Sequence, residues 1–285
     1  MIRIAIPNKG RLAEQTRELF EDAGLELRVT SDRALIATVG DDLEAIFVRS
    51  QDIPEFVADG AADCGVTGWD LVLESERPLV DRLDLGFGRC RLVLAARDDS
   101  PIATVADVAP GTRIATVFPR VTRRFFEQRG CAVEIVPVSG ATEIAPHLGI
   151  ADVIVDLVST GSTLRVNGLR EVATVLDSSA RVIAPREPNP ARAIALESLL
   201  ARVESVVRAR GQRYVMANVP RTVLDQVKRV VPGLDGPTVV DILNEGGHVA
   251  VHAVVAAARI DATILGLKRL GATGILVTRI ERLLP

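Results

Sequence analysis

The segment RIAIPNKGRLAEQTRELFEDAG, residues 3–24, decides the fold class of this chain. It begins with a short β-rich run, Arg3 to Ile6, which is followed by a loop. Apolar and small residues then recur at helical spacing, at Leu12, Thr16, Leu19, Phe20 and Ala23. Gly24 stands where a helix C-terminal cap is expected. This order of strand, loop and helix predicts the βαβ units of an α/β fold.

The same alternation continues through the first two thirds of the chain and predicts a mainly parallel sheet. Further strands are expected at Ala34–Val39, Ala45–Val48, Leu92–Ala96, Arg113–Val117, Val133–Val138 and Val153–Val158. A turn-rich patch at 98–110 follows the Leu92 strand, so a second α/β unit is expected to begin near it. Three prolines within 185–190 precede a long helical pattern that ends at Gly211.

The last 74 residues, 212–285, have a different order of elements. We expect strands at Arg213–Val219, Pro237–Leu243, His248–Val255 and Thr273–Ile280, helices at Pro220–Val230 and Arg259–Leu270, and a turn at Asn244–Gly247. This order is βαββαβ, the ferredoxin-like pattern. Such modules often bind ligands or form assembly surfaces, and the fold alone does not decide between these roles.

Composition limits the classes of function. A length of 285 residues predicts about two domains, and 37 acidic against 34 basic residues give a formal charge of −3, so nucleic acid is not the default partner. No apolar run approaches the roughly 18 residues of a membrane span, and no export signal is visible, so we expect a cytoplasmic protein. Cys64, Cys90 and Cys131 form no CxxC pair, which argues against a disulfide framework or a thiolate zinc site.

The strongest local signal is the run from Asp152 to Leu164, in which a buried strand ends in the hydroxyl-rich loop Ser159–Thr163. Backbone N–H groups, hydroxyls and a helix start in such a loop can bind a phosphate. Asp152 and Asp156 share a strand face but lie about 13 Å apart, so they are not expected to bind one diol together. Asp156 is nearest the loop, and we expect its carboxylate to accept hydrogen bonds from a ribose diol. A phosphoribosyl group fits this arrangement. A strand-to-helix turn capped by Asp156 fits the segment equally well.

Other strand-end loops carry weaker signals. Lys9 and Arg11 follow the first strand and Arg49 follows the Ala45 strand, so these cations suit a polyphosphate at the carboxyl edge of the sheet. Gly65–Asp70 is expected to be a third such loop, with Asp70 capping the next helix or contacting a ligand. A surface charge or a helix cap also explains each of these residues. The sequence contains no P-loop, no dinucleotide-binding fingerprint, no nucleophile elbow of a hydrolase and no zincin motif. His248 and His252 share a strand face, and such a pair is more often structural than a metal site.

Several ordered segments resemble the ATP phosphoribosyltransferase family over essentially the whole chain. The family signature is matched position for position by Glu143-x5-Gly149-x-Ala151-x2-Ile154-x-Asp156-Leu157-x2-Thr160-Gly161-x-Thr163-Leu164. Other recurring segments follow in the right order: Pro7-Asn8-Lys9-Gly10, Gly65-Val66-Thr67-Gly68-x-Asp70, Leu85-Gly86-Phe87-Gly88-x-Cys90-Arg91 and Ile114-Ala115-Thr116-x-Phe118-Pro119. Length and the C-terminal module resemble the long form of the family, which needs no separate regulatory subunit.

The resemblance implies an architecture of two α/β lobes, arranged as in a periplasmic binding protein, with the active site in the crevice between them. The chain crosses between the lobes twice, which suits the boundaries expected near residues 91 and 180. We therefore expect a first lobe at 1–90 with 181–211, a second lobe at 91–180, and a regulatory ferredoxin-like domain at 212–285.

The resemblance also implies the first step of histidine biosynthesis, in which N1 of ATP attacks C1 of phosphoribosyl pyrophosphate. Mg²⁺ would act mainly through the pyrophosphate oxygens, with no side-chain metal ligand assigned. Lys9 and Asp156 are the candidate catalytic residues. The sugar phosphate is assigned to Asp156, Ser159, Thr160, Gly161, Ser162 and Thr163, supported by Glu143 and Asp152. ATP and the pyrophosphate side are assigned to Lys9, Gly10, Arg11, Arg49 and Asp70.

In the long form the C-terminal module binds histidine as a feedback inhibitor, and the corresponding positions are Asn218 and Thr238. Some relatives carry an acidic residue at Asn218, and a neutral amide loses the ion pair with the amino group of the ligand. Family members form dimers and hexamers.

Two alternative functions stay open: a non-catalytic two-lobe solute-binding protein with an amino-acid-sensing tail, and a phosphoribosyltransferase acting on orotate or a purine base.

Overall fold

The computed structural model of the chain describes residues 1–28, 34–40, 43–243 and 246–284. The chain forms two compact units, one made of 1–21 with 25–200 and the other of 22–24 with 201–285. The turn expected at Asn244–Gly247 lies partly outside the described residues. Among the described residues, no helix combines the length and the apolar character needed to cross a membrane.

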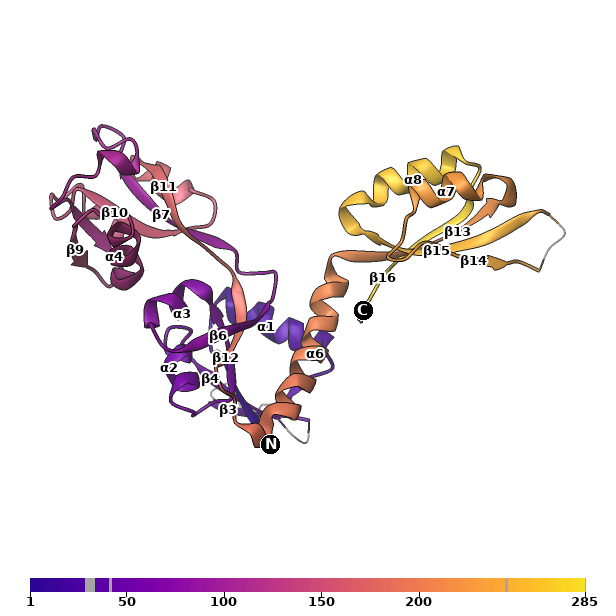
Figure 1. Cartoon of the computed structure of the whole chain (residues 1–285), viewed down its shortest axis with the longest axis horizontal. Helices are drawn as coiled ribbons and strands as arrows, with labels where there is room; N and C mark the ends of the chain where they lie inside the picture. The colour runs from indigo at the N-terminus through magenta and orange to yellow at the C-terminus, as the bar shows by residue number, and fades with distance from the viewer. Residues whose placement is uncertain (29–33, 41–42, 244–245, 285) are drawn as a thin grey trace. The chain divides into compact units, whose positions relative to one another are not determined.

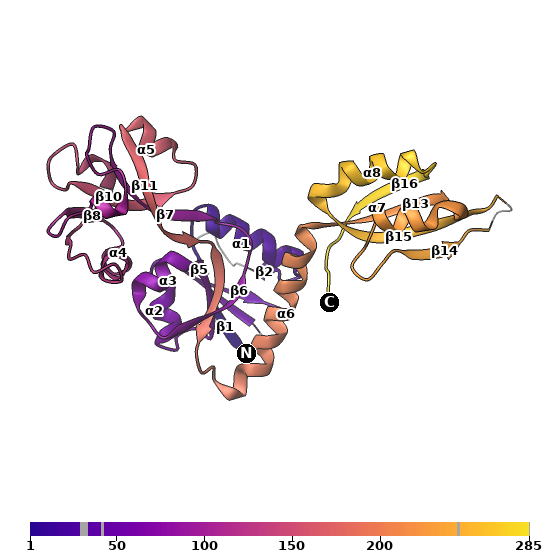
Figure 2. The same ribbon diagram turned by 45° about the horizontal axis from the view of Figure 1, so that its top comes forward.

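The first sheet has the strand order β2-β3-β4-β1-β5-β12-β6. Its strands are β1 (Ile2–Pro7), β2 (Leu27–Arg28), β3 (Ile36–Val39), β4 (Leu43–Val48), β5 (Cys64–Gly68), β6 (Leu79–Asp84) and β12 (Ala180–Pro185). Its helices are α1 (Arg11–Asp22), α2 (Ile53–Ala58) and α3 (Trp69–Ser75), and α2 and α3 lie together beside the sheet (Figure 2). Ile46 packs with the α2 cluster, whereas its neighbour Phe47 lies under Arg17 of α1, so helices cover both faces.

The second sheet has the strand order β11-β7-β10-β8-β9. Its strands are β7 (Cys90–Arg97), β8 (Arg113–Thr116), β9 (Glu134–Pro137), β10 (Val153–Val158) and β11 (Leu169–Ser178), and its helices are α4 (Pro119–Glu127) and α5 (Ser162–Val166). Leu92 and Leu94 face Phe125 and Phe126 of α4, while Val93 faces the cluster that includes α5. Both faces of β7 are therefore buried, which explains its continuous apolar run.

The chain passes between these two sheets twice, through 85–89 and again at Ser179 (Figure 1). The two crossings are bonded to each other, because Leu85 N–H donates to Ala180 O at 3.0 Å and Ala180 N–H donates to Phe87 O at 2.9 Å. A Cβ on Gly88, whose φ is +64°, would lie 2.8 Å from Leu12 of α1. Glycine at this position therefore lets the first crossing approach the start of α1 closely.

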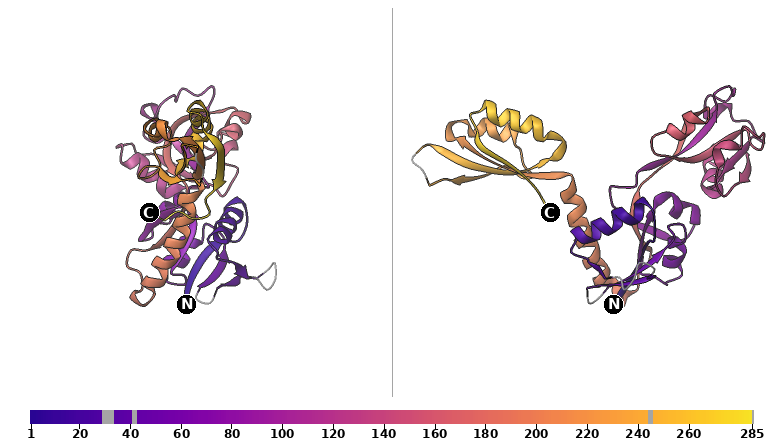
Figure 3. Two further views of the ribbon diagram at one scale, coloured as in Figure 1. Left: turned by 90° about the vertical axis from the view of Figure 1, so that its right-hand side faces the viewer. Right: turned by 180° about the vertical axis from the view of Figure 1, so that it is seen from behind.

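The C-terminal module confirms the expected βαββαβ order. Its elements are β13 (Gln212–Pro220), α7 (Leu224–Val230), β14 (Thr238–Asp241), β15 (His248–Ala256), α8 (Ile260–Arg269) and β16 (Thr273–Arg279), preceded by α6 (Ala193–Arg210). The sheet order is β14-β15-β13-β16, and α7 and α8 lie on one face of it (Figure 3). Alternate residues such as Val215, Val249 and Val251 form the core beneath these helices. The opposite face of the sheet carries Asn218 and His252.

Two expectations about the sheets are wrong. The sheets are mixed rather than mainly parallel, since β1 is parallel to β4 and β5 but β12 is antiparallel to β5 and β6, and β7 is antiparallel to β10 and β11. Residues 65–68, expected at the start of the loop Gly65–Asp70, belong to the fully buried strand β5. A Cβ on Gly65 would lie 2.5 Å from Ile53, so small residues here allow α2 to pack against the strand.

Candidate active site

A pocket of about 180 Å³ lies where β10 ends and α5 begins, and we call it the loop pocket. It is lined by Glu143, Asp156, Leu157, Val158, Ser159, Thr160, Gly161, Thr163 and Leu164. Glu143, Asp156 and most of the predicted loop residues are thus brought together. The Ser162 hydroxyl lies at 3.0 Å from that of Thr160, which holds the loop in a tight turn.

The backbone of this loop has unused hydrogen-bond donors. Within the described residues, the N–H groups of Ser159, Thr160 and Gly161 donate to no protein acceptor. Gly161 has φ +74°, a left-handed conformation that glycine adopts without strain. Because α5 has only five residues, the loop N–H groups rather than a helix dipole are the means by which this segment can bind an anion.

Asp156 has an electrostatic environment that suits hydrogen-bond donors or cations. Its Oδ1 accepts the N–H of Leu157 at 2.7 Å. Burial raises the pKa of Asp156 above its ordinary value, and the negative charge of Glu143 raises it further, against opposing hydrogen bonds from Leu157 and Thr142. The pocket lining includes these two carboxylates and no lysine or arginine. This excess of negative charge can be balanced by the hydroxyls of a diol or by a cation that accompanies a phosphate.

Asp152 lies away from the loop pocket, just before the start of β10. Its carboxylate accepts the backbone N–H of Arg113 at 2.9 Å and Nη2 of the same residue at 2.7 Å. These hydrogen bonds lower the pKa of Asp152. The structure therefore gives Asp152 a structural ion pair and does not bring it to the predicted sugar-phosphate site.

A larger cavity, of about 460 Å³, lies at the two crossings, and we call it the crossing cavity. It is lined by Asp84, Arg89, Cys90, Arg91, Val158, Ser159, Asp177, Ser178, Ser179 and Arg181. Val158 and Ser159 line both cavities, so the two adjoin at the loop. Sequence reasoning assigned no role to these arginines, although Arg91 belongs to the quoted segment that begins at Leu85.

The predicted ATP-side cations lie at the carboxyl ends of two neighbouring strands. Pro7 of β1 pairs with Val48 of β4, and the N–H of Asn8 donates to Val48 O at 2.9 Å. The loops that carry Lys9, Gly10 and Arg11 and that carry Arg49 are therefore adjacent. All three cations are exposed, and none has an ion-pair partner among the described residues.

Asp70 is buried at 4% exposure in the first turn of α3. The Ser178 hydroxyl donates to Asp70 Oδ1 and accepts the Asp70 N–H at 3.0 Å. Burial raises the pKa of Asp70, and the hydrogen bond from Ser178 partly opposes this effect. The carboxylate is thus satisfied within the protein, which favours a structural role over contact with ATP. The expected capping role is wrong, because Gly68 is the N-cap of α3 and no side chain caps this helix.

The two predicted effector residues share the helix-free face of the C-terminal sheet. Asn218 of β13 pairs with Ala250, and Thr238 of β14 pairs with His252, so β15 lies between them. Strands separated by one neighbour are about 9.6 Å apart, so the two side chains do not touch within one chain. His252 bonds to Tyr214 at 3.0 Å, and the described residues contain no group of three or more side chains suited to a metal ion.

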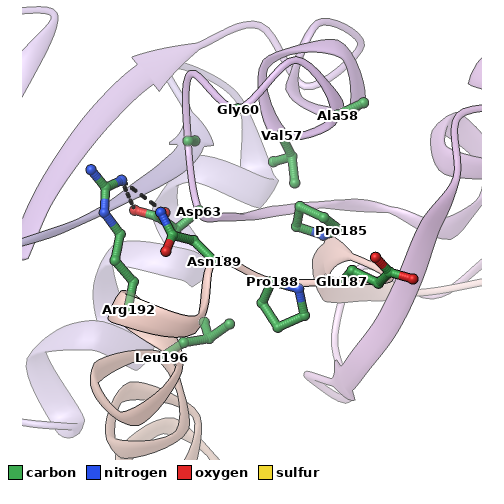
Figure 4. Close-up of a pocket in the computed structure, with 11 residues that line it drawn as sticks. Val57, Ala58, Gly60, Asp63, Pro185, Glu187, Pro188, Asn189, Arg192 and Leu196 are labelled. Carbon is green, nitrogen blue, oxygen red and sulfur yellow. Dashed lines mark hydrogen bonds and ion pairs between the residues drawn. The ribbon is translucent and has the colours of Figure 1, made fainter.

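A further cavity, of about 420 Å³, lies at the opposite end of the first sheet, near the start of β5 (Figure 4). Its charged lining residues are Asp63, Glu187 and Arg192. Both carboxylate oxygens of Asp63 accept Nη1 of Arg192 at 2.9 Å. The N–H of Arg3 also donates to Asp63 at 2.8 Å. These bonds tie β1 to the segment that precedes α6, away from the strand ends that carry the predicted site.

Comparisons with known proteins agree over the whole chain. The family model described as HisG, ATP phosphoribosyltransferase, matches residues 49–205, and the model of the HisG C-terminal domain matches 209–282. The ATP phosphoribosyltransferase of Gemmatimonas aurantiaca is 64% identical to this chain, and the match covers 100% of each of the two chains. The ATP phosphoribosyltransferase of Halorubrum lacusprofundi is 50% identical, and the match covers 99% of each chain. A chain of the ATP phosphoribosyl transferase (HisG:HisZ) complex from Thermotoga maritima matches with TM-score 0.63 and 31% identity, over 73% of this chain and 99% of that one.

Proposed function

Because this chain belongs to the ATP phosphoribosyltransferase family, we propose that it transfers the 5-phosphoribosyl group of phosphoribosyl pyrophosphate to N1 of ATP. The bond from C1 of the ribose to the diphosphate oxygen breaks as the bond to N1 forms, and the diphosphate leaves with the electron pair. N1 of neutral adenine supplies its own lone pair, so the attack requires no protein base. Positioning and charge neutralisation are then the main tasks of the protein.

The loop pocket is the proposed seat of the phosphoribosyl group. The unused N–H groups of Ser159, Thr160 and Gly161 beside the half-buried Asp156 carry this assignment. The 5′-phosphate accepts hydrogen bonds from the loop, including the hydroxyls of Ser162 and Thr163, and the ribose hydroxyls donate to Asp156, with Glu143 behind it. Lys9, Gly10, Arg11 and Arg49 bind the phosphates of ATP.

Mg²⁺ is the proposed cofactor, held mainly through diphosphate oxygens. The excess of negative charge in the loop pocket fits phosphoribosyl pyrophosphate that carries Mg²⁺ better than the free anion. When bound, the ion neutralises the charge that develops on the leaving group. Asp156 and Glu143 are the carboxylates of the loop pocket that would contribute negative charge near the ion, and no side chain is assigned as a dedicated ligand.

Diphosphate release tests this function directly. Release should require ATP and phosphoribosyl pyrophosphate together, and orotate or a free purine base should not replace ATP. Gly161→Val should reduce kcat/KM for phosphoribosyl pyrophosphate by about 100-fold, because a side chain strains the loop and blocks its N–H groups. Gly130→Val is the matched control, because Gly130 has a similar φ of +67° and a Cβ added there would have no atom within 4 Å. Equal activity of the two variants would contradict the assignment.

Histidine feedback inhibition through the C-terminal module is the proposed regulation, in a cytoplasmic enzyme that assembles as a dimer or hexamer. Asn218 and Thr238 face the same side of the sheet and are the proposed contact residues. Asn218→Asp should strengthen inhibition, because it restores an ion pair with the amino group of histidine. Removal of residues from Gln212 onward should abolish inhibition more completely than catalysis. Unchanged inhibition in both variants, with the assembly state followed by sedimentation, would contradict this role.

A further inference from the structure

Arg91 lies beside the loop pocket on the face of the second sheet that carries α5. In β7 it pairs with Val158, the residue that immediately precedes Ser159. Directly opposite residues of an antiparallel pair have Cβ atoms about 5 Å apart. Val93, two residues further along β7, packs in the cluster that includes Leu164 of α5, so Arg91 shares that face. The side chain of Arg91 also lines the crossing cavity together with Ser159.

Glu171 fixes the guanidinium of Arg91. The carboxylate accepts Nη1 of Arg91 at 2.8 Å and Nη2 at 3.1 Å, and the hydroxyl of Thr174 accepts Nη1 at 3.3 Å. The pairing of β11 with β7 is irregular between Glu171 and Ala173, a bulge of the kind that redirects side chains. A Cβ built on Gly161 would lie 3.1 Å from Glu171 Oε1, so the same carboxylate also borders the loop.

The pairing with Glu171 leaves one edge of the Arg91 guanidinium available. A guanidinium has five N–H donors, and Glu171 and Thr174 take three of them from the two Nη atoms. The Nε–H and one Nη2–H remain, and among the described residues no acceptor is bonded to Nε. These two donors lie on the same edge, in the geometry that binds two oxygens of a phosphate at once.

The neighbouring arginines are less suited to this task. Arg181 donates to Asp81 and lies 4.7 Å over the ring of Trp69, and its Nε, which has no partner among the described residues, is too deeply buried to reach a ligand. Arg89 is exposed and has no carboxylate that orients it among the described residues. The loop pocket itself contributes no cation. Arg165 of α5 also borders the loop, since a Cβ on Gly161 would lie 3.3 Å from its Nη1, but among the described residues no carboxylate pairs with it. Arg91 is therefore the cation beside the loop that an ion pair holds in a fixed orientation.

We propose that the free edge of Arg91 binds the diphosphate of phosphoribosyl pyrophosphate, and that Glu171 is a positioning residue that holds the guanidinium in place. The inference rests on the proposed function and identifies the protein group that receives the leaving group. Since the diphosphate gains charge as the C1–O bond breaks, Arg91 contributes more in the transition state than in the substrate complex.

Kinetics of single and double variants of the full chain test this proposal. Arg91→Ala should lower kcat/KM for phosphoribosyl pyrophosphate by about 100-fold, with KM for ATP unchanged. Arg91→Lys should restore only part of this kcat/KM, because an ammonium lacks the planar pair of N–H donors that binds two phosphate oxygens at once. Glu171→Gln should cost about 10-fold in the native background and nothing further in the Arg91→Ala background, because it acts through Arg91. Calorimetric titration of the same variants with diphosphate should show the matching loss of binding.

The matched control is Arg97→Ala at the other end of β7, where Arg97 pairs with Asp99 through Nε at 2.9 Å and Nη2 at 2.6 Å. It removes an equivalent ion pair from the same strand and should leave the kinetics unchanged. Native activity and diphosphate affinity in Arg91→Ala, or additive effects of Arg91→Ala and Glu171→Gln, would overturn the proposal. An unaltered protein that does not release diphosphate from both substrates would contradict the proposed function instead.

Discussion

Asp70 and Asp156 occupy similar places in the two lobes and differ in what surrounds them. Asp70 follows β5 by two residues, Asp156 lies near the end of β10, and burial raises the pKa of both carboxyls. Asp70 is enclosed and takes its hydrogen bonds from Ser178 and its own backbone, whereas Asp156 opens to a pocket beside three unused N–H groups. A buried carboxylate therefore indicates a binding site only where its neighbours leave hydrogen-bonding capacity for a ligand.

Asp156→Asn should produce the largest effect on activity. The amide keeps the size of the side chain but loses the charge and one acceptor that the ribose hydroxyls need, so kcat/KM for phosphoribosyl pyrophosphate should fall about 100-fold or more. Thermal unfolding should be unchanged or shifted upward, because the variant removes a desolvated charge. Asp99→Asn, at an exposed aspartate of the same lobe, is the control. A variant with near-native kinetics would break the distinction between Asp156 and Asp70.

Asp70→Ala should show the opposite pattern, a large loss of stability. The variant leaves the Ser178 hydroxyl and the start of α3 without their partner, at a cost of about 1–3 kcal/mol in the free energy of unfolding. Denaturant titration measures this loss. Stability equal to that of the unaltered protein, together with a raised KM for ATP, would instead assign Asp70 to the nucleotide.

Asp70→Asn isolates the charge of this buried carboxyl. Because the pKa of Asp70 is raised in the folded protein, its contribution to stability is fully present below the unfolded pKa near 4 and is lost as pH rises through the folded value. The amide does not titrate. The free energy of unfolding of the variant, relative to the unaltered protein, should therefore increase as the pH rises above about 4. A difference that does not depend on pH would contradict the raised pKa.

Asp152→Asn should have the smallest effect on catalysis, because its carboxylate is bound by Arg113 at the far end of β10. We expect kcat/KM within about twofold of the unaltered protein, the range of a surface change outside the site. A loss comparable to that of Asp156→Asn would return Asp152 to the sugar-phosphate site. Steady-state kinetics of both variants at one pH decide whether Asp152 contributes to the sugar-phosphate site.

Much of the architecture could be predicted from local patterns. The strands β1, β8 and β10, the helix that closes at Gly24, and the whole βαββαβ module follow from periodicity and turn residues. The direction of strand pairing could not, because an alternating or continuous apolar pattern is the same in parallel and antiparallel strands. β11 was missed because its bulges break the two-residue period, and β5 because its glycines resemble a loop.

The site was predicted where its residues are contiguous and missed where they are not. Ser159 to Thr163 lie in one run, and their hydroxyls and glycine signal an anion site directly. Arg91 and Glu171 are 80 positions apart and meet only because β7 and β11 pair across the lobe. The buried state of Asp70 depends in the same way on Ser178, a residue 108 positions away.

The most direct measurement is a crystal structure of the full chain with phosphoribosyl pyrophosphate and Mg²⁺. We expect the 5′-phosphate at about 3 Å from the N–H groups of Ser159, Thr160 and Gly161, with the ribose hydroxyls donating to Asp156. An empty loop, with the sugar phosphate bound by other residues, would contradict it.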